Sequence, residues 1–209
     1  MKATEEPLTT HSLQRRLIEL TIASEAIIDS FVHALDLREH EAEGHTARVA
    51  ELTVRLARAF NLTEAQLNDI KHGALLHDIG KMGIPDYVLQ KPSALDEEEW
   101  AMMRKHPQIA YDLLSPVAYL HGALDIPYCH HEKWNGTGYP QHLSGEQIPL
   151  GARVFAVVDV WDALTSDRPY RKAWSKKDAL EHIRLQSGDH FDPAVVERFL
   201  ELQEKENQE

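Results

Sequence analysis

The choice between an all-helical fold and a mixed fold depends on residues 152–164, which read Ala152-Arg153-Val154-Phe155-Ala156-Val157-Val158-Asp159-Val160-Trp161-Asp162-Ala163-Leu164. The pair of valines at its centre is compatible with a buried strand. However, apolar positions recur around all faces of the segment, which favours a buried helix. Elsewhere the chain has no alternating strand pattern and no internal repeat of about 20 to 50 residues. The sequence therefore predicts an all-α protein.

A long helix is predicted at the beginning of the chain, over residues 12–37. Its apolar residues follow the 4, 3 spacing of a coiled-coil seam, interrupted by one serine: Leu13, Leu17, Leu20, Ser24, Ile27, Phe31 and Ala34. Two interpretations stay open. The helix is either packed on its own domain or serves as a dimerising, signal-transmitting helix.

Several other helix boundaries can be read from local signals. Residues 49–59 carry an apolar face, and residues 63–66 form a capping box that begins the next helix. Residues 96–99 begin a further helix, which should end or kink near His106 because Pro107 follows. Asp192 and Pro193 are typical of the start of a helix, and residues 135–140 form a glycine-rich loop. The result is a bundle of helices.

The composition excludes several classes of protein. With 34 acidic and 22 basic residues among 209, the formal charge is −12, which argues against a nucleic-acid-coating surface. The single cysteine, Cys129, is expected to be a buried thiol rather than a zinc ligand. No segment resembles a membrane span or a signal peptide, so we expect a cytoplasmic protein. The 13 histidines are more than a chain of this kind usually has. Either a metal site or ordinary surface positions would explain them.

The candidate metal ligands are nitrogen and oxygen donors spread along the chain. His77 and Asp78 are adjacent and can converge only where a helix ends, as the following glycines indicate. Read singly, these residues also have structural explanations, such as a helix cap or a packed imidazole. Together they are typical of a di- or trinuclear iron or manganese site. The set comprises Glu41, His45, His77, Asp78, His106, His130, His131 and Asp159.

The order of these ligands resembles the HD superfamily of metal-dependent phosphohydrolases. The segment His130-His131-Glu132-Lys133-Trp134-Asn135-Gly136-Thr137-Gly138-Tyr139-Pro140 is similar to the HD-GYP branch of that superfamily. The resemblance covers residues 41–200. It implies an HD-domain-like helical bundle, preceded by the long N-terminal helix, that hydrolyses cyclic di-GMP to linear pGpG and on to GMP. Hydrolysis would use a hydroxide bridging two metal ions.

The resemblance also implies roles for individual residues. One metal would be held by His45, His77, Asp78 and Asp159, and a second by Asp78, His106 and His130. His131 and Glu41 would complete the set or add a third metal. Asp78 and Lys81 would act in catalysis. Contacts to the substrate would come from Lys81, Gly138, Tyr139, Pro140, Arg168 and Arg171. Asn135 stands where the family usually has aspartate, a position that shapes the loop.

We therefore expect an N-terminal helix over residues 1–40, a catalytic domain over 41–204 and a tail over 205–209. The expected partners are cyclic di-GMP, a second copy of the chain through the N-terminal helix, and a diguanylate cyclase or sensor domain. Three alternatives are a low-turnover signalling module, a hydrolase of 3′,3′-cGAMP and, less favoured, a mononucleotide hydrolase. The last group lacks segments like those at 130–140.

Overall fold

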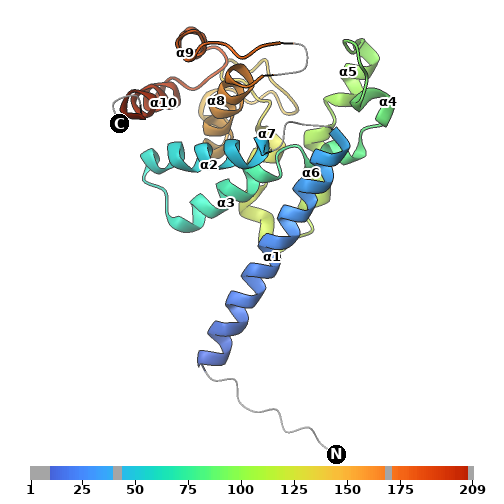
Figure 1. Ribbon diagram of the computed structural model, residues 1–209, viewed down its shortest axis with the longest axis vertical. Helices are drawn as coiled ribbons and strands as arrows, with labels where there is room; N and C mark the ends of the chain where they lie inside the picture. The colour runs from blue at the N-terminus through green and yellow to red at the C-terminus, as the bar shows by residue number, and fades with distance from the viewer. Residues whose placement is uncertain (1–9, 40–43, 168–170, 207–209) are drawn as a thin grey trace, which may run out of the picture.

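The protein is helical throughout the part of the chain that the computed structural model describes, residues 10–39, 44–167 and 171–206 (Figure 1). Within these ranges the only β-type pairing outside named elements is an isolated bridge between Ser187 and Phe191. The all-α prediction is confirmed. The longer helices are α1 (Thr10–Glu39), α2 (His45–Ala57), α3 (Glu64–Leu75), α5 (Glu97–Met103), α6 (His106–Leu114), α8 (Leu150–Thr165), α9 (Lys176–Leu185) and α10 (Pro193–Glu206). Shorter elements are η1 (Arg58–Phe60), η2 (Ile79–Gly83), α4 (Asp86–Leu89), η3 (Ala118–Ala123), α7 (Asp125–Cys129) and η4 (Gly145–Gln147).

Helix α8 forms the centre of the main core, as its apolar composition predicts. Val154, Phe155, Val157 and Val158 are fully buried, and helices α2, α3, α9 and α10 contribute the surrounding apolar side chains. Burying each side chain of this size contributes about 1.5–3 kcal/mol relative to exposure. A helix that is apolar all round therefore stabilises a fold only when other helices cover it on all sides.

The predicted starts of α3, α5 and α10 are confirmed, but the end of α5 was misplaced. Thr63 and Asp96 both form capping boxes, and Asp192 Oδ1 accepts from the Ala194 amide. Helix α5 ends at Met103, and His106 begins α6 with Pro107 in its first turn. Proline is favoured in a first turn because the amide it lacks has no helical partner there. His106 is therefore at a helix start, not at a broken helix end.

Helix α1 packs on the body with its C-terminal half and projects from it with its N-terminal half (Figure 1). The packed face contains Ile28 and Leu35, which are buried, and Val32 beside them. The apolar residues of the predicted seam are different ones, and large members of it remain exposed: Leu13, Leu17, Leu20, Ile27 and Phe31. One helix thus has a packed face and a separate exposed apolar face. In the described residues, no helix has the length and apolar content needed to cross a bilayer.

Two polar clamps join α1 to the body. Glu25 accepts from His72 Nε2 at 2.7 Å and pairs with Lys71 Nζ at 3.0 Å. Near the other end of the helix, the Arg38 guanidinium donates to the carbonyls of Lys81 and Ile84 at 2.9 and 2.6 Å. The buried imidazole of His72, which the sequence left without a partner, therefore positions α1.

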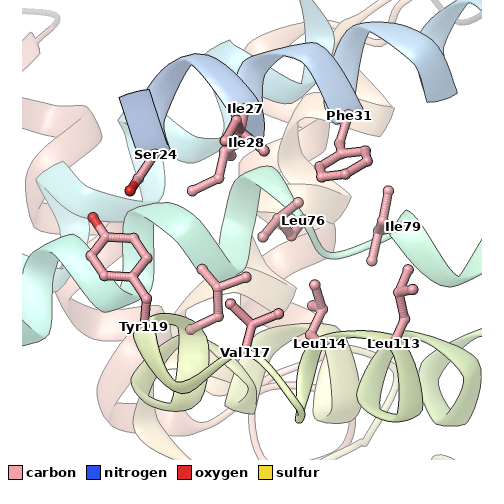
Figure 2. Close-up of a pocket in the computed structure, with 11 residues that line it drawn as sticks. Ser24, Ile27, Ile28, Phe31, Leu76, Ile79, Leu113, Leu114, Val117 and Tyr119 are labelled. Atoms are coloured by element: carbon pink, nitrogen blue, oxygen red, sulfur yellow. The ribbon is translucent and has the colours of Figure 1, made fainter. Parts of the chain in front are cut away.

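An apolar groove of about 320 Å³ lies beside α1, between this helix and the segment 113–120 (Figure 2). Ile27 and Phe31 reach into it from α1, opposite Leu113 and Val117. All four side chains are exposed by more than a third. The exposed face of α1 is therefore continuous with an apolar surface of the body.

Replacing Glu25 by alanine is expected to loosen α1. The pKa of Glu25 is lowered, chiefly because His72 donates a hydrogen bond, although burial opposes the shift. The contribution to stability is therefore present above the unfolded pKa of glutamate and is lost as pH falls through the lower folded pKa. Amide exchange within residues 25–39 should be about fivefold faster at neutral pH in the variant, as measured by mass spectrometry. Glu19→Ala, which breaks an exposed pair with Arg15, is the control and should leave exchange there unchanged.

Candidate functional site

A cavity of about 570 Å³ brings together most of the predicted site residues. This volume is within the usual range for small-molecule sites. Polar ligand-type side chains form one wall, and a mixed wall from α5 and the 130–140 loop faces it. The lining residues are His45, His77, Asp78, Lys81, Leu95, Trp100, Met103, Arg104, His106, His130, His131, Tyr139, Asp159 and Ala163.

His77 and Asp78 reach the cavity because α3 ends immediately before them. The helix ends at Leu75, and Asp78 precedes the 3₁₀ turn η2. The two side chains therefore do not point in different directions, as neighbouring side chains on a regular helix do. Gly80 in this turn lies against α6: a Cβ there would be 1.9 Å from the His106 carbonyl oxygen. Only glycine permits this approach, which brings the turn and the start of α6 together.

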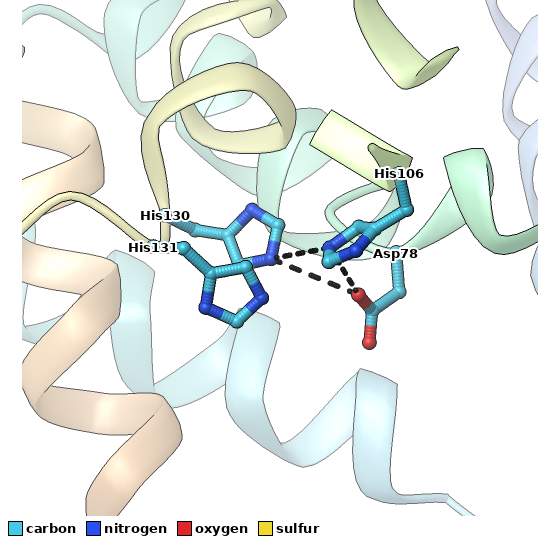
Figure 3. Close-up of side chains that lie close together, drawn as sticks. All are labelled: Asp78, His106, His130 and His131. Carbon is cyan, nitrogen blue, oxygen red and sulfur yellow. Dashed lines mark hydrogen bonds and ion pairs between the residues drawn. The ribbon is translucent and has the colours of Figure 1, made fainter. Parts of the chain in front are cut away.

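Four side chains form a compact cluster: Asp78, His106, His130 and His131, each with one ligand atom within 4.8 Å of the others (Figure 3). Asp78 Oδ1 is 3.3 Å from His106 Nε2 and 3.7 Å from His130 Nε2. Its other oxygen, Oδ2, is 3.0 Å from His77 Nε2 and 2.7 Å from Lys81 Nζ. The carboxylate therefore lies between two groups of basic atoms.

Three of the histidines share one hydrogen-bonding arrangement. The Nδ1 atoms of His77, His106 and His130 lie 2.9, 2.8 and 3.1 Å from backbone carbonyls three or four residues earlier. A carbonyl only accepts, so each Nδ1 carries a hydrogen and each Nε2 faces the cavity. A histidine that ligates a metal is typically held in this way.

Two imidazole nitrogens face each other at close range in this cluster. His106 Nε2 and His130 Nε2 are only 3.2 Å apart. Burial lowers the pKa of His106 to about 4 despite the nearby charge of Asp78. Burial, reinforced by the neighbouring histidines, also holds the pKa of His131 well below its usual range. Neutral imidazoles with convergent lone pairs fit a divalent metal, since metal ligation requires deprotonated nitrogen.

A second group of side chains extends the site toward α2 and α8. His45 Nδ1 is 2.6 Å from Asp162 Oδ2, the carboxylate–histidine arrangement seen behind metal ligands. Asp159 lines the same cavity and makes no hydrogen bond or ion pair within the described residues. An uncompensated carboxylate in a cavity is costly, which favours a cation nearby. Glu41 lies outside the described residues.

The charges at the centre of the site are strongly coupled. Burial alone would raise the pKa of Asp78, but the charges of His77 and Lys81 hold it well below its usual range. Burial alone would lower the pKa of His77, but Asp78 and then Asp159 raise it to about 9. The Asp78 carboxylate is therefore anionic and draws positive charge to this part of the cavity.

The 130–140 loop closes one side of the cavity. The Tyr139 ring stacks on His131 with centroids 4.7 Å apart, and Pro140 follows through a cis peptide bond. Gly138 is buried, and a Cβ there would be 2.4 Å from the Glu132 Cα, so the loop folds back closely on its own start. Asn135 Oδ1 accepts from the Thr137 amide, which agrees with the predicted role in shaping the loop.

Of the two predicted phosphate-binding arginines, only Arg171 is described, and it is not among the lining residues. The Arg171 guanidinium donates to the Ala163 and Leu164 carbonyls at the C-terminal end of α8. Arg168 lies outside the described residues. Cys129 is buried, as expected, and burial raises the pKa of its thiol to about 12, so it stays protonated at neutral pH.

Three site residues had no predicted role. Asp162 orients His45, and Arg104 lies 5.9 Å from the Tyr139 ring centroid. Glu132 is only 2% exposed and accepts from the backbone amides of Gln141 and Leu143 at 2.7 and 3.1 Å. Its position after two histidines in an otherwise loop-forming stretch was the available signal that this carboxylate is buried.

Replacing Glu132 by glutamine is expected to destabilise the loop. Glutamine offers one acceptor oxygen, so its amide group would face one of the two backbone donors. Leaving a buried donor without a partner costs about 1–3 kcal/mol, which urea unfolding should detect. Glu146→Gln, an exposed change in the same region, is the matched control. An unfolding midpoint equal to that of the wild type would show that Glu132 does not support the loop.

Comparison with known proteins agrees with this geometry. A profile of the HD domain matches residues 29–195. A cyclic di-GMP phosphodiesterase from Vibrio cholerae is 41% identical over 209 residues, covering 93% of this chain and 42% of the relative. The 3′3′-cGAMP-specific phosphodiesterase 2 of the same organism is 38% identical over 187 residues, covering 88% and 36%. A cyclic di-GMP phosphodiesterase from Thermotoga maritima is 40% identical over 174 residues, covering 81% and 47%. The chain thus spans about a third to a half of these relatives' length.

Two solved structures share the fold. A cyclic GMP-AMP-specific phosphodiesterase from V. cholerae superimposes with a TM-score of 0.67 at 24% identity, covering 85% of this chain and 48% of that one. An HDG"Y"P protein from Bdellovibrio bacteriovorus gives 0.61 at 21% identity, covering 77% and 51%. An all-α fold around a paired His-Asp site defines the HD class, and the chain belongs to the HD-domain family. Its relatives and the order of its motifs place it in the HD-GYP branch.

Proposed function

We propose that the protein is a metal-dependent phosphodiesterase that hydrolyses cyclic di-GMP to linear pGpG, GMP or both. The observation that carries the proposal is the convergence of three histidine Nε2 atoms and Lys81 Nζ on the Asp78 carboxylate inside one cavity. Relatives named cyclic di-GMP phosphodiesterases support the same activity. The chain covers less than half of either relative, so the activity is proposed for this domain.

The proposed cofactor is a group of two or three divalent ions, iron or manganese. Nitrogen and oxygen donors without sulfur favour these metals. His45, His77, Asp78 and Asp159 would hold one ion, and Asp78 would share a second with His106 and His130. His131 and Glu41 would complete the set or hold a third. When bound, such ions activate water and offset charge on the phosphoryl oxygens.

The side chains have separable tasks in this proposal. Lys81 Nζ, 2.7 Å from Asp78, carries a positive charge to the place where a substrate phosphate would lie. Tyr139, held by its stack on His131, would position a guanine at the wall built from Gly138 and Pro140. Arg171 would reach the substrate only if it left the α8 carbonyls, and Arg168 is the nearby alternative for holding phosphate.

Incubating purified, metal-replete protein with cyclic di-GMP tests the proposal. Separation of the products by chromatography should reveal pGpG or GMP, and chelation should stop the reaction. Anaerobic purification with elemental analysis would identify the metal and its number. Intact cyclic di-GMP after overnight incubation would instead favour the low-turnover signalling module.

A second candidate substrate is 3′,3′-cGAMP. This alternative is supported by a relative at 38% identity whose name specifies that dinucleotide. Both substrates present two phosphodiesters to the same cluster and differ in one base. Parallel assays at equal concentration distinguish them, because a cyclic di-GMP enzyme should show the higher kcat/KM with cyclic di-GMP.

The proposed setting is cytoplasmic signalling, with residues 1–40 acting as a connecting helix and residues 41–204 as the catalytic domain. Residues 205–209 would form a tail. A second copy of the chain, a sensor domain or a diguanylate cyclase would contact α1, whose exposed face includes Leu17 and Leu20. Sedimentation of the wild type and of Leu17→Glu would test the contact between copies.

A further inference from the structure

Trp100 of α5 and Arg104, which caps the C-terminal end of that helix, line the cavity. These residues are four positions apart and therefore lie on one face of the helical turn. Helix α5 is held in place by its Asp96–Glu99 capping box and by an ion pair between Lys91 and Glu99. These interactions hold the start of α5 to the segment that precedes it.

Arg104 lies near two aromatic rings. Its Cζ is 5.8 Å from the Trp100 ring centroid and 5.9 Å from that of Tyr139. Its guanidinium makes no hydrogen bond or ion pair within the described residues, unlike Arg38 or Arg153, which pair with carboxylates. A guanidinium donates its hydrogen bonds only in its own plane. The fork is therefore available to a ligand at the cavity wall.

The order of the stacked groups indicates which part of a ligand Arg104 would meet. His131 belongs to the four-residue cluster, Tyr139 stacks on it, and Arg104 lies near the Tyr139 ring. Lys81, which is proposed to bind the phosphate, pairs with Asp78 and therefore lies at the cluster end of this series of side chains. In a nucleotide the base is separated from the phosphate by the sugar. Arg104 is therefore positioned for a base rather than for the phosphate undergoing hydrolysis.

We propose that Arg104 is a guanine-recognition residue, clamped by Trp100 and Tyr139, for the second-messenger substrate. The inference rests on the proposed phosphodiesterase function and adds the chemical basis of its base selectivity. Guanine presents O6 and N7 as two adjacent acceptors, which match the fork of an arginine. Adenine presents an amino donor in place of O6, so it cannot accept both hydrogen bonds. Trp100 is then a positioning residue that keeps the guanidinium plane in place.

The test compares Arg104→Met and Arg104→Lys with the wild type on cyclic di-GMP and cyclic di-AMP. We expect KM for cyclic di-GMP to rise about tenfold in both variants, since lysine retains the charge but not the fork. Values for cyclic di-AMP should change less than about twofold. Trp100→Ala should give a smaller rise in the same direction. Hydrolysis of bis(p-nitrophenyl) phosphate, which has no base, is measured beside them, and its KM should rise less than that for cyclic di-GMP.

Two controls separate the failure modes. Lys105→Met removes the neighbouring exposed charge and should leave both KM values unchanged. Affinity for a phosphorothioate analogue of cyclic di-GMP, which resists hydrolysis, is measured by calorimetry on metal-loaded protein. Wild-type affinity in the Arg104 variants, or equal losses with both dinucleotides, would overturn the inference. If the wild type binds the analogue but leaves cyclic di-GMP intact, the phosphodiesterase proposal fails, and the affinities of the variants still decide the role of Arg104. If the wild type does not bind the analogue, both proposals fail.

Discussion

Replacing Asp78 by asparagine should abolish both metal retention and hydrolysis of cyclic di-GMP. The amide preserves the shape of the side chain but removes the charge that lies between His77, Lys81, His106 and His130. Mutating a residue that hydrogen-bonds to a metal ligand typically lowers metal affinity or activity about 10–100-fold. Loss of the central carboxylate itself should therefore lower kcat/KM at least about a thousandfold. Elemental analysis of the purified variant should detect less than about a tenth of the wild-type metal.

The control for this change is Asp112→Asn on α6. Asp112 is exposed and accepts a hydrogen bond from Gln108, on the same helix that carries His106. This control variant should retain its metal and its activity within about twofold. An Asp78→Asn protein that keeps its metal and hydrolyses cyclic di-GMP within about threefold of the wild type would show that the centre lies elsewhere.

Replacing Gly80 by alanine should have the largest effect on stability. The added methyl group would lie 1.9 Å from the His106 carbonyl oxygen and 2.7 Å from the Ala110 amide nitrogen. Both are backbone atoms, so α6 must move away from η2, and it takes His106 with it. Overpacking of this kind costs about 1–3 kcal/mol and occasionally more, and here we expect at least about 3 kcal/mol in urea unfolding.

Gly83→Ala provides a matched comparison in the same turn. A methyl group there would meet Ile109 side-chain atoms at 3.0 and 3.1 Å, and a flexible side chain can yield by a few tenths of an ångström. The cost should stay below about 1 kcal/mol. If Gly80→Ala unfolds at the same urea concentration as Gly83→Ala, the close approach between η2 and α6 is not a structural requirement.

Local sequence signals were sufficient for most of the fold. The apolar run of α8, the capping boxes at Thr63 and Asp96, and the Asp192 cap each depend on neighbouring residues, and all are confirmed. The packed face of α1 could not be found in the same way. Leucine and isoleucine occur around most of that helix, so the 4, 3 spacing matched the exposed face while Ile28 and Leu35 face the body.

The site was predictable as a set of residues but not as a set of contacts. The order of histidines and aspartates indicated the cavity, and seven of the eight proposed ligands line it. Contacts between residues far apart in the sequence could not be predicted, because the residues around each partner do not indicate the other. His45 meets Asp162 117 positions away, and His72 meets Glu25 47 positions away. The base-facing wall at Arg104 was missed because a helix beginning with four acidic residues resembles an ordinary solvated surface.

Through the hydrogen bonds of Arg38, a movement of α1 would act on the turn that contains Lys81 and follows Asp78. At about 1.5 Å per residue, a 30-residue helix is about 45 Å long, and its free half projects from the body. Arg38 lies in the last turn of the helix, where it holds the Lys81 and Ile84 carbonyls. A force applied near Thr10 would act across the Glu25 clamp, near the middle of the helix, on the Arg38 end. The hydrogen bonds that hold α1 would transmit a tilt of the helix to the backbone of Lys81. The side chain of Lys81 pairs with the Asp78 carboxylate.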